Sequence, residues 1–358
     1  MGNSIAAQDS LVNLRADFNK YSVDALFEKY AEIGFLYPEK LSLLKPFLNK
    51  IKANWKILKE SPEELLWILS IQNGNQENFA SVSGIKQSNY GLLAQHLVSD
   101  GNPFLTLKVM LDAQFRAEHL CSEDEVRSTQ NWFRPNNRYA YRIFSSMYKK
   151  LGNEKAFIKQ YEYLHLDVAD IMPYSNQNYR IEEVTGYDIE LIEFVKEQYS
   201  NVFVKAEELD QQDILLNTLN NKYEKYGLKR YRRICKVINQ ETNQIKACII
   251  ANRSPIGLNF SFLENRCYYI TDNTVKEPEL FAMLSVMNNY AAKVYDDFEL
   301  GKVPIVTDEL TSRSLQTLGA NLIRIYVQSI WLREGFSQWH KHIHSFLLRI
   351  ESKLKKVA

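Results

Sequence analysis

The first candidate site is a polar loop at the start of a proline-led helix. Leu97, Val98, Ser99, Gly101 and Asn102 form this loop, with Asp100 between them and Pro103 after them. Proline suits the first helical position, Asn102 or Asp100 can cap the helix, and glycine permits a tight turn. Because the first amides of a helix carry partial positive charge, the loop predicts an anion site. An ordinary capped helix is the alternative, since Asp100 would repel an anion unless it caps the helix.

The elements around this loop occur twice along the chain. Each copy contains an apolar strand, a polar loop, a proline-started helix, another strand, and a helix that ends in Leu-Gly. The copies span residues 90–152 and 266–319, and they share pattern more than identity. Such a repeat predicts an internal duplication of an α/β unit.

The flanking segments also repeat in the same order. Apolar residues at helical spacing predict two or three helices within residues 1–52, and residues 55–61, 65–71 and 79–85 are expected to form an antiparallel meander. After residue 172 the order returns: helices, strands over 232–238 and 244–252, and a strand over 324–332. We expect an α+β fold with two tandem domains, 1–172 and 173–358, each with a mixed, mostly antiparallel sheet flanked by helices.

This order of elements resembles the GCN5-related N-acetyltransferase (GNAT) superfamily, in two tandem copies. The resemblance covers nearly the whole chain as element order. The family's loop is usually Q/R-x-x-G-x-G/A, and residues 96–101, HLVSDG, depart from it at two positions. The resemblance implies an acyl-CoA-dependent N-acyltransferase of direct transfer, with acetyl-CoA or another acyl-CoA as co-substrate held at Leu97, Val98, Ser99, Gly101 and Asn102, and with no metal.

The resemblance also implies a proton donor and a base. Family enzymes often carry a tyrosine four residues before the glycine that ends the later helix, where it protonates the departing thiolate. Tyr148 meets that spacing before Gly152 and is the candidate acid, whereas Leu315 stands at the matching place before Gly319. His96 is the candidate base, with Glu118 as an alternative. The N-terminal copy is therefore the better candidate for catalysis.

The junction after the fourth strand of the first copy interleaves basic, aromatic and amide residues. Arg134, Asn137 and Arg138 are the candidate substrate-binding residues there, and a plain surface helix start is the alternative. In the second copy, the loop 270–278 contains no glycine, and Lys276 alone offers a phosphate contact. A catalytically degenerate tandem GNAT-like binding or regulatory protein is the alternative to the enzyme.

Composition limits the partners of this chain. Hydrophobic residues make up 45% of it and the net charge is +1, which disfavours nucleic acid as a partner. The cysteines lack metal-type spacing, and the histidines at 340, 342 and 344 favour a polar helix face over a zinc site. No run of residues predicts a membrane span or signal peptide, so a cytoplasmic location is expected. The acceptor is expected to be a small-molecule or protein amine, and a homodimer stays open.

Overall fold

The computed structural model describes residues 15–61, 65–72, 78–122, 126–172 and 178–357. Two compact units make up the chain. The first comprises residues 1–131, 143–155 and 331–358, and the second comprises residues 132–142 and 156–330. We predicted a domain boundary between residues 172 and 173. Residue 173 lies outside the described residues, so a division of the chain at that point stays a prediction.

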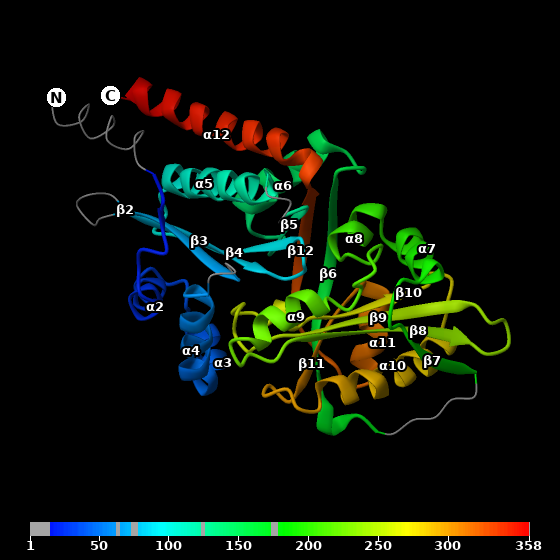
Figure 1. Cartoon of the computed structure of the whole chain (residues 1–358). Coiled ribbons are helices and arrows are strands. Elements are labelled where there is room, and N and C mark those ends of the chain that lie inside the picture. The colour runs from blue at the N-terminus through cyan, green and yellow to red at the C-terminus, as the bar shows by residue number, and fades with distance from the viewer. Residues whose placement is uncertain (1–14, 62–64, 73–77, 123–125, 173–177, 358) are drawn as a thin grey trace. The chain divides into compact units, whose positions relative to one another are not determined.

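The first unit is a sheet with helices on both faces (Figure 1). Its strands are β1 Asp17–Phe18, β2 Leu66–Gln72, β3 Phe79–Lys86, β4 Gly91–Ser99 and β5 Ser128–Phe133, in that spatial order. Its helices are α2 Val23–Glu32, α3 Pro38–Leu44, η1 Lys45–Phe47, α4 Leu48–Lys59, α5 Pro103–Ser122, most of α6 Arg138–Leu151, η4 Arg333–Gly335 and α12 Phe336–Val357. Residues 132–133 of β5 and 138–142 of α6 belong to the second unit. Figure 1 shows α5 and α12 side by side on one face of β2 to β4, with α2 to α4 on the other face.

The second unit repeats the pattern of strands and helices. Its strands are β6 Ala156–Asp167, β7 Tyr179–Glu183, β8 Tyr231–Asn239, β9 Ile245–Arg253, β10 Cys267–Thr271, β11 Lys302–Thr307 and β12 Asn321–Leu332, in the spatial order β12-β6-β11-β10-β9-β8-β7. Its helices are η2 Val168–Asp170, α7 Ile189–Gln198, α8 Asn201–Ala206, α9 Asn217–Glu224, η3 Leu263–Asn265, α10 Glu279–Tyr295 and α11 Glu309–Thr317. In Figure 1, α10 and α11 cover one face of this sheet, and α7 to α9 lie on the other.

The α+β fold class is confirmed, with a mixed and mostly antiparallel sheet. In both units three antiparallel strands precede a helix and a parallel strand: β2-β3-β4 with β5, and β8-β9-β10 with β11. The two glycines that were expected to end the later helices do so with positive φ, +75° at Gly152 and +96° at Gly319. Glycine is favoured there because a side chain would strain that backbone conformation.

One predicted strand is wrong. Residues 55–61 were expected to open the meander, but α4 continues through Trp55 to Lys59. Ile51, Trp55 and Leu58 are all fully buried at a spacing of four and three residues. That spacing places them on one face of a helix. Burial of this apolar face favours a helix over the strand that the alternation of apolar and polar residues in 55–61 had predicted.

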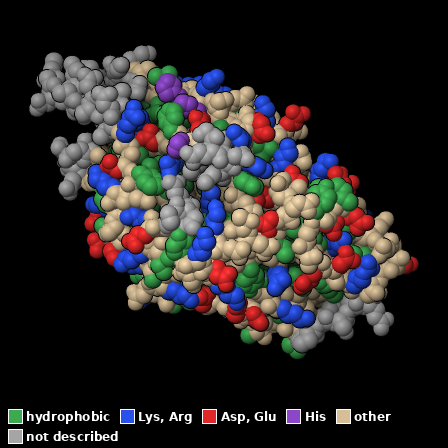
Figure 2. All heavy atoms as spheres, viewed as in Figure 1, with side chains coloured by type: hydrophobic (Ala, Val, Ile, Leu, Met, Phe, Trp, Pro, Cys, Tyr) green, Lys and Arg blue, Asp and Glu red, His purple; other side chains and the backbone are tan. Residues whose placement is uncertain are grey.

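Charges on the surface are mixed in sign. Over the face drawn in Figure 2, Lys and Arg side chains alternate with Asp and Glu side chains and no large region carries one sign. The three cysteines of the second unit, Cys235, Cys248 and Cys267, are buried and unbridged, as their apolar strand context predicted. No helix among the described residues is long and apolar enough to span a membrane.

Candidate functional site

Strands β4 and β5 diverge in the first unit. Their parallel pairing covers Gly91 to Leu93, opposite Ser128 to Gln130, while β4 continues to Ser99. Leu97, Val98 and Ser99 therefore lie beyond the last residue pair with β5. A parallel pair that separates in this way leaves strand edge beside the start of the following helix, which is where the sequence predicted an anion site.

The amides of the predicted anion loop already have acceptors within the loop itself. Asn102 caps α5, because its Oδ1 accepts from the amides of Phe104 at 3.0 Å and Leu105 at 3.3 Å. The Gly101 amide donates to the Ser99 hydroxyl at 3.2 Å. These bonds are those of an ordinary helix cap. An anion at this helix start would have to displace the Asn102 side chain, which is a rotation at a partly exposed position.

Asp100 takes part in the same loop as an acceptor. Its two carboxylate oxygens accept from the amide of Phe79 at 2.6 Å and from the amide of Asn102 at 3.3 Å. The carboxylate thus ties β3 to the start of α5 and satisfies a loop amide that an anion could otherwise use. Coenzyme binding at Leu97, Val98, Ser99, Gly101 and Asn102 stays a prediction.

His96 lies inside an aromatic enclosure. Its ring stacks on Trp55 of α4 with centroids 5.4 Å apart, and Phe35 and Tyr30 approach it edge-on at 5.8 and 6.4 Å. Its Nδ1 lies 3.1 Å from the Ser83 hydroxyl. Burial, with a smaller contribution from the positive charge of Lys40, lowers its pKa well below 6.5. His96 is therefore neutral and weakly basic near neutral pH.

The backbone at His96 explains why its ring turns into this enclosure. Its φ is +50°, and the pairing of β3 with β4 shifts register between Ser81 and Ser83. Such a bulge redirects one side chain and bends the strand. The ring faces the α2 to α4 side, whereas α5 covers the other face of this sheet (Figure 1). No glycine marks this bulge, so residue type did not predict it.

Tyr148 is half-buried on α6, in the last turn before Gly152. Ser146 of the same helix lies 3.1 Å from Nε2 of His342 on α12, and Phe144 stacks on Trp331 and Trp339. These contacts fix the position of α6 in the first unit. At the matching place in the second unit, Leu315 is fully buried in α11. No hydrogen bond or ring contact among the described residues joins Tyr148 to His96, and both roles stay predictions.

Arg134, Asn137 and Arg138 belong to the second unit. Asn137 begins α6 as its cap, because its Oδ1 accepts from the amide of Ala140 at 3.2 Å, and its own amide donates to the carbonyl of Arg134 at 2.9 Å. Asn137 and Arg138 are exposed, and Arg134 is half-buried. This is the geometry of a capped helix start, and substrate binding by these three residues stays a prediction.

In the second unit, β10 and β11 separate at the position that matches the divergence of β4 and β5. Side chains there join β10 to α11. The pairing of β10 with β11 covers Cys267 and Tyr268, after which β10 continues to Thr271. There the hydroxyl of Thr271 lies 2.9 Å from that of Thr311, the latter in the first turn of α11, and both residues are buried. Lys276, the predicted phosphate contact, lies in a loop where Asp272 pairs with Lys246 at 3.0 Å. Direct bonds therefore link the end of β10 to α11.

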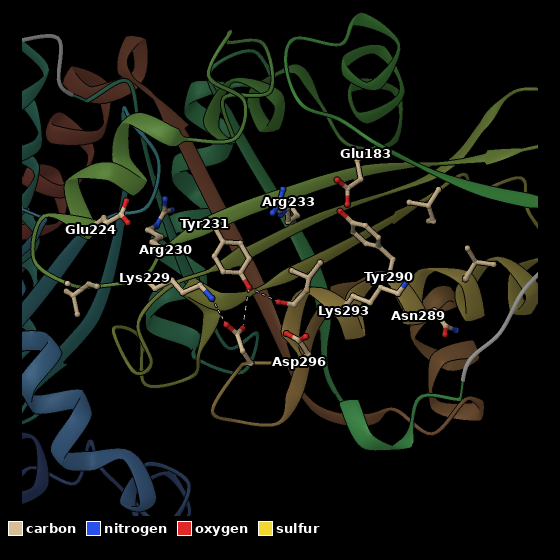
Figure 3. A pocket seen from close by; sticks show the side chains of 16 residues that line it. Glu183, Glu224, Lys229, Arg230, Tyr231, Arg233, Asn289, Tyr290, Lys293 and Asp296 are labelled. Carbon is tan, nitrogen blue, oxygen red and sulfur yellow. Dashed lines mark hydrogen bonds and ion pairs between the residues drawn. The ribbon is translucent and has the colours of Figure 1, made fainter.

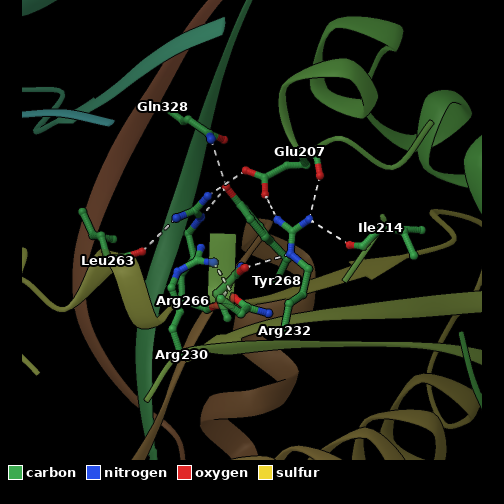
Figure 4. A network of polar contacts seen from close by, with 10 residues as sticks. Glu207, Ile214, Arg230, Arg232, Leu263, Arg266, Tyr268 and Gln328 are labelled. Atoms are coloured by element: carbon green, nitrogen blue, oxygen red, sulfur yellow. Dashed lines mark hydrogen bonds and ion pairs between the residues drawn. The ribbon is translucent and has the colours of Figure 1, made fainter. Parts of the chain in front are cut away.

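The most conspicuous polar feature of the second unit was not predicted. Glu207 is buried between two arginines, with carboxylate oxygens 2.5 Å from Arg232 and 2.7 Å from Arg266 (Figure 4). Arg232 also donates to the backbone carbonyl of Glu207, and Arg266 donates to that of Leu263 at 3.1 Å. Sequence signals for this cluster were weak, since Arg232 lies in the basic run of residues 229–233 and no motif marks Glu207.

The arginines hold backbone segments that adopt unusual conformations. Glu208, Leu216 and Phe262 all have φ between +54° and +58°, and each lies next to or near a residue whose backbone carbonyl accepts from these arginines. Such conformations cost about 1–3 kcal/mol each for residues other than glycine. The buried ion cluster thus fixes three connecting loops on the α7 to α9 face of the second unit.

The histidine series near the C-terminus lies on a helix, as expected. His340 and His344 approach each other on α12 with ring centroids 6.4 Å apart, and His342 points to Ser146. Within the described ranges, no group of three or more His, Cys, Asp or Glu side chains is arranged to hold a metal ion.

Comparisons with known proteins give similarity of structure alone. No protein-family model matches the sequence, and no curated protein is similar to it. A tandem GNAT protein from the clavulanic acid biosynthesis pathway aligns over 78% of this chain and 87% of its own, with 10% identity and a TM-score of 0.37. A GCN5-related N-acetyltransferase from Sphaerobacter thermophilus aligns over 79% and 85%, with 11% identity and a TM-score of 0.37.

A Drosophila protein has the higher TM-score of 0.43, at 11% identity, over 89% of this chain and 98% of its own. Identities and TM-scores of this size assign no residue role and no activity. The solved structures that resemble this chain thus include proteins described as GNAT enzymes, and among them a tandem one.

Proposed function

We propose that the first unit binds an acyl-coenzyme A and transfers its acyl group directly to an amine. The observation that carries this proposal is the divergence of β4 and β5 after Leu93, beside the N-terminus of the 20-residue helix α5. A long thioester ligand needs a strand edge for its arm and a helix start for its phosphates, and this arrangement offers both. The pyrophosphate would take the amides that Asn102 now caps.

The reaction needs no covalent enzyme intermediate. The amine nitrogen attacks the thioester carbonyl carbon, the carbon–sulfur bond breaks, and the thiolate of coenzyme A leaves. Tyr148 donates its phenolic proton to that thiolate. His96, or a water that it holds, accepts the proton released by the amine. The acceptor is a small-molecule or protein amine.

The second candidate function is a catalytically degenerate tandem protein that binds or regulates a partner. Two observations favour it. The loop amides of the first unit are satisfied by Ser99, Asp100 and Asn102, and the second unit joins β10 to α11 through Thr271 and Thr311. If the protein is catalytically degenerate, neither unit binds a coenzyme between its strands.

Calorimetric titration of the full chain with acetyl-CoA, and with longer acyl-CoA thioesters, separates the two functions. The enzyme proposal predicts saturable binding of one thioester per chain, followed by release of free thiol when an amine acceptor is supplied from a panel. Absence of heat with every thioester would remove the enzyme and leave the degenerate protein. Binding without thiol release from any amine would support a coenzyme-binding regulator.

A further inference from the structure

A groove in the second unit lies between helix α10 and the start of β8, where β8 is no longer paired with β7 (Figure 3). Its volume is about 1140 Å³. The end of β7, the start of β8 and the loop before it form one wall, and α10 forms the other. It is lined by charges of both signs and by the apolar side chains of Ile181 and Val286.

Two opposite charges meet on one side of this groove. In the β7 to β8 ladder, Glu183 lies opposite Cys235, and Arg233 precedes Cys235 by two residues. Glu183 and Arg233 are therefore diagonal neighbours on one sheet face, where such Cα atoms lie about 7–8 Å apart. Figure 3 shows the Glu183 carboxylate next to the hydroxyl of Tyr290, which comes from α10.

Among the residues that the structure describes, no ion pair joins Glu183 or Arg233 to another residue. The Glu183 carboxylate lies beside the buried hydroxyl of Tyr290 (Figure 3). Burial raises the pKa of Tyr290, with a contribution from Glu183 that Arg233 opposes, so both charges act on that hydroxyl. Lys293 on α10 also lacks an ion-pair partner in this part of the chain.

Of the other charges that line the groove, Lys229, Arg230 and Asp297 already have partners, whereas Glu224 and Asp296 are exposed carboxylates. Asp297 accepts from Lys229 and, at 2.8 Å, from Arg253. Arg230 donates to Asn220 at 2.7 Å. Near the end of β7, Glu183 and Arg233 thus offer one carboxylate and one guanidinium side by side, with Lys293 as a second cation on the facing helix.

We propose that this groove binds an α-amino acid in its zwitterionic form, with the carboxylate on Arg233 and the α-ammonium on Glu183. A guanidinium pairs with a carboxylate through two parallel hydrogen bonds, and a carboxylate accepts from an ammonium. A phosphate or a dicarboxylate would bring negative charge against Glu183, and a polyamine would meet Arg233 and Lys293. Ile181 and Val286 offer apolar surface to the ligand's side chain. The site is separate from acyl transfer.

The test uses the full chain and the twenty L-amino acids as probes. Each is titrated calorimetrically, and the amino acid that binds most tightly is compared with its N-acetyl derivative and its carboxamide. Each derivative removes one charge, so the wild-type protein should bind each about tenfold more weakly or worse. Failure of all twenty to give saturable heat would overturn the proposal.

Two variants then assign each charge to its partner. Glu183→Gln should weaken the parent amino acid about tenfold and leave the N-acetyl derivative unchanged, and Arg233→Gln should do the same for the parent and the carboxamide. Glu309→Gln and Arg313→Gln, an exposed pair on α11, are matched controls that should bind normally. Unchanged binding in both groove variants would place the ligand elsewhere and contradict the proposal, whereas the predicted pattern would confirm it.

Discussion

The two α/β copies differ in what closes the end of their third strand. In the first copy, Asn102, Asp100 and Ser99 close the loop with short-range bonds at partly exposed positions. In the second copy, the buried hydroxyls of Thr271 and Thr311 join β10 to α11 directly. The same pattern of elements thus ends in an exposed cap in one copy and a buried bridge in the other.

This difference indicates which copy can accept a ligand at low cost. A solvent-accessible hydrogen bond contributes about 0.5–1.5 kcal/mol net, and an incoming anion replaces it with bonds to the same amides. A buried pair that separates leaves both groups unsatisfied, which costs about 1–3 kcal/mol for each group. The comparison therefore favours the first copy for binding and a structural role for the second.

The largest expected effect concerns the buried charges of the second unit. Glu207→Gln leaves Arg232 and Arg266 without their shared countercharge, so we expect a loss of about 3–5 kcal/mol in the free energy of unfolding, measured by urea denaturation. The exposed Glu309→Gln is the matched control, with a loss below about 1 kcal/mol. Equal and small losses in both variants would mean that the cluster does not stabilise the second unit.

Tyr148→Phe tests the difference between Tyr148 and Leu315. Without the phenolic proton donor, turnover of acyl-CoA should fall about 100-fold or more, while the affinity for acyl-CoA is retained. Tyr141→Phe, at an exposed tyrosine on the same helix, should leave turnover unchanged. Normal turnover in the Tyr148 variant would mean that the thiolate takes its proton from another group.

The pH dependence of stability tests the enclosure of His96. Its pKa is lower in the folded chain than the ordinary 6.5, so the unfolded chain binds more protons between the two values. The stability that the neutral ring contributes is full above about pH 6.5 and declines as pH falls, by at most about 1.4 kcal/mol per pH unit.

His96→Asn, which tolerates positive φ, should flatten this decline in unfolding curves recorded at several pH values. His165→Gln gives the comparison in the second unit, where burial lowers the pKa of His165 to about 4. A decline that is equally steep in wild type and in the His96 variant would show that the ring is accessible to protons in the folded chain.

The smallest expected effect concerns the cap itself. Asn102→Ala removes the acceptor of two α5 amides and should cost about 1 kcal/mol of stability, measured by denaturation. Because the pyrophosphate is proposed to use those amides, the affinity for acetyl-CoA should be unchanged or greater. Asp308→Ala removes the cap of α11 in the second copy and should lower stability without affecting affinity. A tenfold fall in affinity for the Asn102 variant would mean that its side chain contacts the ligand.

The sequence predicted the order of elements well because that order depends on local signals. Pro103 at a helix start, Gly152 and Gly319 at helix ends, and apolar runs in strands are each fixed by neighbouring residues. Trp55 was wrongly assigned to a strand because a segment as short as 55–61 does not distinguish the period of a helix from that of a strand.

The contacts between buried polar side chains could not be predicted, because they join residues that lie far apart in the sequence. Glu207 meets Arg266 across 59 positions, and the Thr271 hydroxyl meets that of Thr311 across 40. The bulge that turns His96 toward Trp55 has no glycine to mark it. Residue type and spacing therefore predicted where the loops and helices lie, but not which polar groups satisfy one another.

Hydrogen–deuterium exchange of the full chain with and without acetyl-CoA tests most directly whether the first copy alone holds the coenzyme. We predict slower exchange of the amides at 97–106, at the end of β4 and the start of α5, with no change at 271–281 in the second copy. Protection of the second loop, or saturable coenzyme binding with no protection at 97–106, would contradict this account.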